Sequence, residues 1–256
     1  MKLDIYIANP AGNITIFVKN DVNQDNYIEI ANKLINLKEY KAEQVAFIKE
    51  LNNKPYKMEM MGLEFCANAS RSFAYLVARE NNIETPTIIN VDVSGIKSTI
   101  DVEVDLDNND ATIEMNPPQD IKTISINDIN YPLVIMEGIM HVIIEESDFD
   151  KTLCQQILNF VLEKYSVDAL GFMFVDNNEM YPVVYVHDTK TLIHEGSCGS
   201  GSIAYAYYLY NKLQDKTNNY AISLNEPGGI LKVSIINEKC YLSGELSISK
   251  LTTVEI

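Results

Sequence analysis

The 256-residue sequence has no long hydrophobic run, and its first residues lack a basic stretch followed by an apolar one. No segment approaches the roughly 20 apolar residues that a membrane-spanning helix needs. The beginning of the chain also does not have the pattern of a signal peptide. We therefore expect a cytoplasmic protein that has no membrane partner.

Basic residues are scarce, with 20 Lys and Arg against 36 Asp and Glu and a formal net charge of −16. A surface of this sign repels phosphate backbones and anionic lipids. Nucleic acid is therefore a poor candidate partner. The charges are scattered along the chain, as in a protein whose surface charge serves its solubility.

Cysteines are also few, and no two of them form a CxxC pair. Cys66, Cys154, Cys198 and Cys240 are spread over the whole chain. This spacing argues against a zinc site and against a disulfide framework. We expect four reduced thiols and no metal site.

The pattern of strand-like and helix-like segments occurs twice in the same order. Each half has strands, an amphipathic helix, more strands, a cysteine-headed apolar helix and further strands. We interpret this order as a diverged internal duplication. The expected helices cover 25–38, 67–80, 150–165 and 198–213.

The duplication predicts two domains with a hinge at NPPQD, 116–120. The first domain would span 1–117, completed by a C-terminal strand at about 246–256. The second would span 118–245.

Two cysteines stand at the beginnings of corresponding helices. EFCANASRSFAYLVA (64–78) and GSCGSGSIAYAYYLY (196–210) each place small and polar residues after a cysteine, and Cys66 and Cys198 are 132 residues apart. The first N–H groups of a helix have no partner within the helix, so they can bind a carboxylate. The same helix end is expected to lower the pKa of a thiol.

Two such thiols predict acid–base catalysis at one carbon. One thiolate would remove a proton beside a bound carboxylate, and the other thiol would return one on the opposite face. The N–H groups would stabilise the developing negative charge. Cys66 and Cys198 are therefore the predicted catalytic residues. The predicted carboxylate site consists of Ala67, Asn68, Gly199 and Ser200.

A free cysteine at a helix start can also be a small buried hydrophobe. Cys154 and Cys240, within an apolar helix and a strand, are expected to have that structural role. The occurrence of two matched motifs favours catalysis at the other pair. Two alternatives remain: an amino-acid-binding protein without turnover, and another isomerase or a dehydratase on the same scaffold.

Five short motifs resemble those of the diaminopimelate epimerase superfamily, the pyridoxal-phosphate-independent amino-acid racemases and epimerases. The motifs are PAGN (10–13), CANASR (66–71), GIMH (138–141), SCGSGS (197–202) and PGGILKV (227–233). The resemblance implies an α/β (α+β) fold with two similar domains. Each would be a curved, mostly antiparallel sheet around a central helix, with the active site in the cleft between them. It also implies no cofactor, a substrate contact at Asn13 and a homodimer.

Several positions depart from the epimerase pattern. Ala67 replaces the usual Gly, and Ile139 and Gly171 stand where the epimerase has Asn. The paired Glu-Arg before the second cysteine is missing, and HEGSC, which contains Glu195, is found there. A site that lacks these polar groups cannot select a polar substrate end. Diaminopimelate is therefore a doubtful substrate.

The sequence is more similar to the branch that includes the histidine racemases of metallophore biosynthesis. Within AEQVAFI (42–48), the resemblance implies that Glu43 faces the substrate, and a carboxylate there could hold an imidazolium. Gln44 would point to the opposite face of a regular strand, so only one of the two is expected to contact substrate. His141 and Glu195 could orient the thiols.

Together these features predict a cofactor-independent racemase whose partner is a small-molecule amino acid, with histidine the favoured substrate. Racemisation of another amino acid, or epimerisation of diaminopimelate, is the alternative.

Overall fold

The computed structural model describes residues 1–146, 148–187, 190–214 and 218–256. They form two compact units. One comprises Met1–Glu114 with Leu242–Ile256, and the other comprises Met115–Tyr241. The sequence places these boundaries after residues 117 and 245. Each unit is described below by itself.

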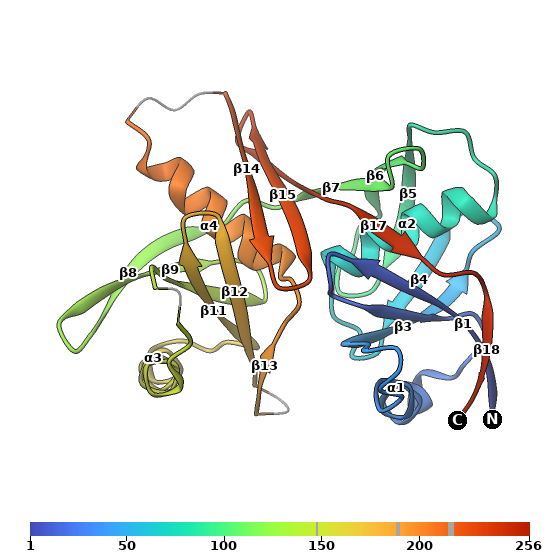
Figure 1. The fold of residues 1–256 in the computed structure, drawn as a ribbon, viewed down its shortest axis with the longest axis horizontal. Coiled ribbons are helices and arrows are strands. Elements are labelled where there is room, and N and C mark those ends of the chain that lie inside the picture. Colours follow the sequence, from blue (N-terminus) through green and yellow to red (C-terminus); the bar gives the residue numbers. More distant parts are fainter. Residues whose placement is uncertain (147, 188–189, 215–217) are drawn as a thin grey trace. The chain divides into compact units, whose positions relative to one another are not determined.

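The first unit contains two α-helices, a short 3-10 helix and a set of strands (Figure 1). Its C-terminal strands β17 and β18 both pair antiparallel with β1. Its elements are β1 (Lys2–Pro10), β2 (Thr15–Val18), η1 (Gln24–Asn26), α1 (Tyr27–Ile35), β3 (Gln44–Glu50), β4 (Tyr56–Met60), α2 (Ala67–Glu80), β5 (Thr87–Val93), β6 (Ile100–Asp105), β7 (Asp110–Met115), β17 (Leu246–Ile248) and β18 (Thr252–Glu255).

The second unit repeats the order of strands and helices. Its elements are β8 (Asp120–Ile126), β9 (Ile129–Ile135), β10 (Ile139–Ile144), α3 (Lys151–Lys164), β11 (Ala169–Asp176), β12 (Glu179–Val186), β13 (Thr191–His194), α4 (Gly199–Lys212), β14 (Asn219–Glu226), β15 (Gly229–Ile236) and β16 (Lys239–Ser243).

The strand pairing of the two units also agrees. In each unit, a helix connects two neighbouring parallel strands. Helix α1 connects β2 to β3, and α3 connects β10 to β11. The next strand then pairs antiparallel, β4 with β3 and β12 with β11. Antiparallel hairpins β5–β6 and β14–β15 follow α2 and α4. The predicted mixed α/β class with mostly antiparallel pairing is confirmed.

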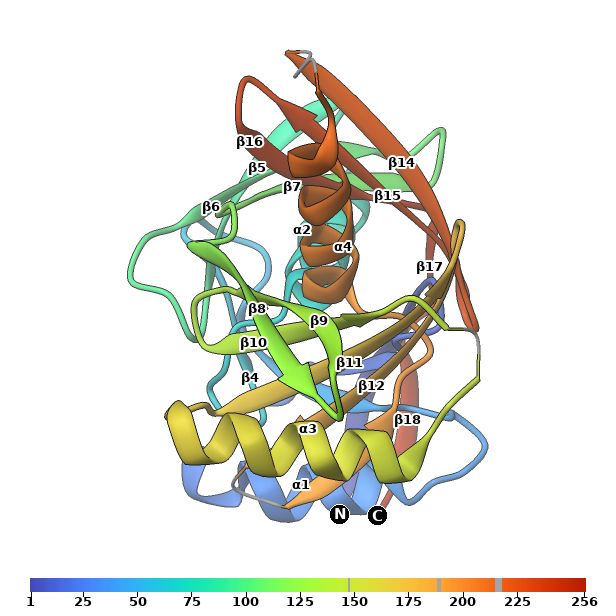
Figure 2. The same ribbon diagram turned by 90° about the vertical axis from the view of Figure 1, so that its left-hand side faces the viewer.

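Each sheet separates an outer helix from a central one, because successive side chains of a strand point to opposite faces. In the second unit, Val142 and Ile144 pack in the cluster that includes α3, while His141 contacts α4. Figures 1 and 2 show α3 and α4 on opposite sides of the β8–β12 strands. In the first unit, Ile16 packs with α1 residues, and Phe17 lies against Phe73 of α2 with ring centroids 6.1 Å apart.

The two central helices differ in burial. Every residue of α2 from Ala67 to Ala78 is buried. In α4, Ser200 is half-buried and continuous burial is limited to 201–206. Tyr210 is buried, while Tyr207 and Tyr208 are half-buried. No helix among the described residues is long and apolar enough to cross a membrane.

Some predicted boundaries are wrong by several residues. The segment predicted as a helix over 25–38 forms η1 and then α1, which ends at Ile35. Strand β6 begins at Ile100, after a turn in which Gly95 has a φ of +83°. Turn geometry of this kind gives only a weak signal in the sequence.

The outer helix α3 begins with a side-chain cap. Oδ1 of Asp150 accepts hydrogen bonds from the backbone N–H groups of Thr152 and Leu153, at 2.7 and 3.1 Å. We expect Asp150→Ala to lower the free energy of unfolding by about 1 kcal/mol, the usual cost of a lost cap. Urea denaturation would measure it, with the exposed neighbour Asp148→Ala as control. Equal losses in both variants would contradict a capping role.

Candidate active site

Cys66 and Cys198 occupy the same local backbone geometry at the beginnings of α2 and α4. Each is the N-cap residue, with φ and ψ of −132° and 115° for Cys66 and −130° and 103° for Cys198. In each helix a serine four residues later, Ser70 or Ser202, donates its hydroxyl to the cysteine carbonyl, at 2.8 and 2.9 Å. The two motifs singled out in the sequence therefore form equivalent helix starts.

Polar side chains from the loop before β2 and from the beginning of β3 form a cluster beside Cys66. Asn13 is buried, and its amide nitrogen donates to a carboxylate oxygen of Glu43 at 2.7 Å. Nε2 of Gln44 donates to Oδ1 of Asn13 at 2.8 Å and lies 3.3 Å from Sγ of Cys66. The backbone N–H of Ala69 also donates to that sulfur, at 3.5 Å. Donors of this kind stabilise a thiolate.

Glu43 and Gln44 both reach this cluster, and that only one of them contacts substrate stays a prediction. Both side chains contact Asn13, one through its nitrogen and the other through its oxygen. The reason is that β3 begins at Gln44, so Glu43 lies in the loop before the strand and is not bound by strand alternation.

The first turn of α2 is held from within the unit. Ala67 and Asn68 are both buried. Oδ1 of Asn68 accepts from Nε of Arg71 at 3.1 Å, and Nη1 of Arg71 donates to the carbonyl of Gly244. Burial lowers the pKa of Arg71 to about 10, and the charges of Asp110 and Cys66 oppose that shift. The Asn68 side chain therefore has a role in orienting a buried cation.

In the second unit, His141 and Cys198 meet through Ser200. Nε2 of His141 lies 3.0 Å from Oγ of Ser200, and that oxygen lies 3.6 Å from Sγ of Cys198. The three side chains form a chain of polar contacts from β10 to the first turn of α4. Gly199, which lies between Cys198 and Ser200 in the chain, is buried.

The His141 ring fills space that Gly171 leaves open. The two residues are register partners in the parallel pair β10–β11. A Cβ at Gly171 would come within 2.2 Å of Nδ1 of His141. His141 is fully buried, and burial lowers its pKa to about 3, so the ring is neutral at physiological pH. Nδ1 has no hydrogen-bond partner among the described residues.

The predicted fall in thiol pKa is wrong for Cys198. Burial raises its pKa well above 9, and the charges of Glu195 and Glu226 raise it further. The contacts with Ser200 and the Gly201 backbone act in the opposite direction. Loss of solvation and two nearby carboxylates therefore outweigh the stabilising effect of the helix start.

Glu226 is a neighbour of Cys198 that the sequence interpretation missed. It is the last residue of β14, and its Oε2 accepts from the backbone N–H of Cys198 at 2.7 Å. A signal for it exists in the sequence, because it stands two residues after buried Leu224 on the inward-facing positions of the strand. A charged residue at such a position requires a partner.

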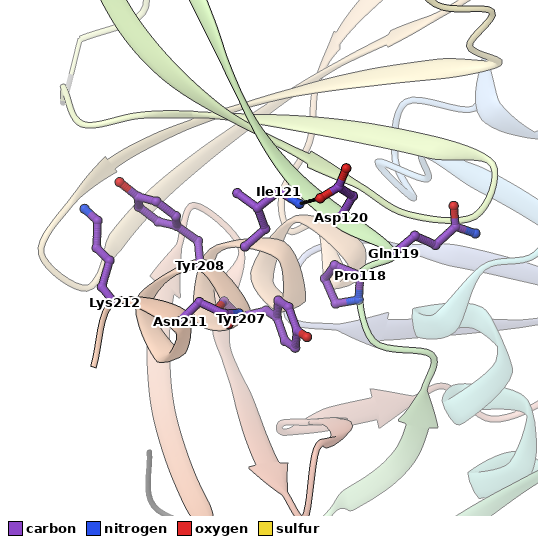
Figure 3. A pocket seen from close by; sticks show the side chains of 8 residues that line it. All are labelled: Pro118, Gln119, Asp120, Ile121, Tyr207, Tyr208, Asn211 and Lys212. Atoms are coloured by element: carbon purple, nitrogen blue, oxygen red, sulfur yellow. Dashed lines mark hydrogen bonds between the residues drawn. The ribbon is translucent and has the colours of Figure 1, made fainter. Parts of the chain in front are cut away.

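A pocket of about 480 Å³ lies elsewhere in the second unit, between the start of β8 and the last two turns of α4 (Figure 3). Tyr207 and Tyr208 line it together with Lys212, and none of the predicted site residues takes part. Among the described residues, no group of three or more His, Cys, Asp and Glu is arranged to hold a metal ion.

Comparison with known proteins identifies a family and relatives of this chain. A family model described as "Histidine racemase CntK N-terminal domain" matches residues 2–254. A histidine racemase of Fusobacterium nucleatum subsp. nucleatum is 35% identical over 257 aligned positions, which cover 96% of this chain and 94% of the relative. A histidine racemase of Staphylococcus aureus is 26% identical over 260 positions, covering 96% of this chain and 93% of the relative.

Solved structures share the fold at low sequence identity. A predicted epimerase from Pseudomonas aeruginosa superposes with a TM-score of 0.70 at 10% identity, covering 99% of both chains. This likeness confirms the predicted α/β architecture, and the family match confirms the resemblance that was based on the five short motifs. The chain belongs to the histidine racemase CntK N-terminal domain family, a family of amino-acid racemases.

Proposed function

We propose that this protein racemises histidine without a cofactor, using Cys66 and Cys198 as its two acid–base groups. The observation that carries the proposal is the pair of equivalent helix starts, each with a cysteine at the N-cap. A protein that only binds an amino acid would need neither thiol. The names of the Fusobacterium and Staphylococcus relatives support histidine as the substrate.

The local environments favour opposite protonation of the two thiols. Cys66 receives N–H donors from Gln44 and Ala69, which stabilise a thiolate. Cys198 lies near two carboxylates, and its raised pKa keeps it a thiol. In one direction of the reaction, Cys66 would take the α-proton, and the Cys198 S–H would then protonate the opposite face of the carbanion. The reverse direction uses the same groups in exchanged roles.

The remaining polar groups would bind the substrate. N–H groups in the first turns of α2 and α4, including those of Ala67, Asn68, Gly199 and Ser200, would stabilise the carboxylate as it gains charge. His141 would orient Ser200, and Glu195 would add negative charge near Cys198. Glu43 is half-buried beside the Asn13–Gln44–Cys66 cluster, where its carboxylate could accept a hydrogen bond from an imidazole or an ammonium group.

Proton NMR in D₂O tests the proposal, under reducing conditions with a chelator and no added cofactor. L-histidine should lose its α-proton signal while D-histidine appears by chiral chromatography, and D-histidine should behave in the same way. A panel including diaminopimelate, proline and aspartate should exchange far more slowly. Faster turnover of another amino acid would overturn the substrate assignment. Turnover that requires added pyridoxal phosphate would overturn the cofactor-free mechanism.

Glu43→Gln tests the substrate side-chain contact. An amide can still accept from Asn13 but carries no charge, so we expect the KM for histidine to rise about tenfold with kcat changed less. Steady-state kinetics would measure both constants. Glu103→Gln, an exposed change on β6 of the same unit, is the matched control. A fall in kcat at constant KM would place Glu43 in the proton-transfer step instead.

A further inference from the structure

Glu226 is a buried carboxyl group with a defined set of partners. It is 7% exposed, at the end of β14. Its Oε2 accepts the Cys198 N–H at 2.7 Å, and its Oε1 lies 2.5 Å from the Ser202 hydroxyl. One side chain therefore contacts both the N-cap residue of α4 and the end of its first turn.

The hairpin that carries Glu226 is itself attached to the segment before Cys198. Glu226 pairs with Gly229 across the β14–β15 turn. The backbone N–H of Gly228 in that turn donates to the carbonyl of Gly196 at 2.8 Å. The tip of the hairpin thus contacts the chain on both sides of Ser197, which is buried. Movement of the hairpin would move the thiol.

In the first unit the equivalent position is a serine, which also contacts the segment before the cysteine. Ser94 follows Cys66 by the same 28 residues that separate Cys198 from Glu226. Its hydroxyl donates to the carbonyl of Glu64, two residues before Cys66, at 2.9 Å. The position 28 residues after the cysteine is therefore a neutral serine in the first unit and a carboxylic acid in the second.

We propose that Glu226 is a positioning residue that fixes the backbone of Cys198 and keeps its side chain in the thiol form. This inference rests on the proposed function and explains why two equivalent helix starts would hold opposite protonation states. Protonated Glu226 can donate to Ser202, whose hydroxyl then donates to the Cys198 carbonyl at 2.9 Å. Ionised Glu226 accepts from Ser202 and places negative charge beside the thiol.

The order of ionisation within this cluster follows from its neighbours. Burial raises the pKa of Glu226 to about 8, and the charge of Glu195 adds to the shift, while hydrogen bonds from Ser202 and the Cys198 N–H oppose it. His141, which contacts Cys198 through Ser200, is neutral and adds no charge to this group. Because the pKa of Cys198 lies well above 9, the carboxyl ionises first and the cysteine retains its proton.

Two substitutions separate the positioning role from the charge. Glu226→Gln keeps an acceptor for the Cys198 N–H and a donor for Ser202, so it mimics the protonated carboxyl without ionising. Glu226→Ala removes both contacts. The matched control is Glu163→Gln on the exposed face of α3.

The first measurement is a pH titration of each protein labelled with ¹³Cβ cysteine, with the Cys198 signal assigned from Cys198→Ser. Glu226→Gln should lower the midpoint of the Cys198 titration by about one pH unit. It should also move the pH profile of kcat for histidine in the same direction. Identical Cys198 titrations for Glu226→Gln and Glu163→Gln would overturn the proposal. This titration needs no turnover, so a protein that fails to racemise histidine would refute the proposed function and leave Glu226 testable.

The second measurement compares kcat and stability. Glu226→Ala should lower kcat about tenfold or more with a smaller change in KM, and Glu226→Gln should restore most of that loss. Because folding raises the pKa of Glu226, the free energy of unfolding of the wild type should fall as pH rises from about 5 to about 8. That of Glu226→Gln should fall less over the same range. Equal kcat values for the Ala and Gln variants would contradict a positioning role.

Discussion

Cys66→Ala and Cys198→Ala are each expected to lower the proposed histidine racemisation at least about 10³-fold, because each removes one of the two proposed proton-transfer groups. The two variants should nevertheless differ in deuterium exchange. Cys198→Ala retains the thiol that has N–H donors from Gln44 and Ala69. That thiol can still remove and return the α-proton of one enantiomer on the same face.

Exchange by Cys66→Ala should be slower. The remaining thiol is Cys198, and its burial and the nearby carboxylates disfavour the thiolate that must act as base. We expect exchange without inversion at a rate about tenfold or more below that of Cys198→Ala, and with the opposite enantiomer. Proton NMR of D- and L-histidine in D₂O, run separately, would measure both rates.

Buried cysteines outside the site are the controls. Cys154 and Cys240 are 2% and 0% exposed, and Cys154 belongs to the apolar cluster around α3. Cys154→Ala and Cys240→Ala should retain racemisation close to that of the wild type. Full racemisation by either active-site variant would refute the two-thiol mechanism. Equal exchange rates in both would refute the difference in protonation.

The parts of the site that could be predicted from the sequence are local. Each cysteine motif contains its own helix start, so Cys66 and Cys198 and their N-cap positions follow from a few neighbouring residues. The duplication adds the correspondence between them. Asn13 and Gln44 required a resemblance to known proteins, because their contacts with Cys66 join segments that lie far apart in the sequence.

The parts that could not be predicted depend on which distant residues surround a group. The pKa of Cys198 is raised by burial and by carboxylates, one of which comes from a hairpin 28 residues later. The helix start alone would have the opposite effect. The Glu43 side chain reaches the same cluster as that of Gln44, because β3 begins at Gln44 and Glu43 is not part of the strand. For Cys198 the error comes from applying a local rule where tertiary contacts decide the pKa.

Gly171→Ala should destabilise the second unit strongly. Its Cβ would lie 2.2 Å from Nδ1 of His141, 2.8 Å from Cε1 of the same ring and 2.9 Å from Cε of Met173. The buried ring cannot move without breaking its contact with Ser200. We expect the free energy of unfolding to fall by about 3 kcal/mol, near the upper end of the cost of overpacking a core. Urea denaturation would measure the change.

Gly138→Ala is the control for the substitution itself. Its added Cβ meets no atom within 4 Å, although its φ of +78° makes a side chain strained. Its cost should be about 1 kcal/mol, the strain of the left-handed backbone alone. A loss at Gly171 no larger than this would mean that the His141 ring is free to move aside.

A double-mutant cycle identifies the cause of the loss at Gly171. In a His141→Ala background the ring is gone, so the added Cβ at Gly171 should cost at least about 1 kcal/mol less than in the wild type. The same cost in both backgrounds would assign the strain to Met173 instead. A lower cost in the His141→Ala background would show that the imidazole ring, which contacts Ser200, excludes a side chain from position 171 in this protein.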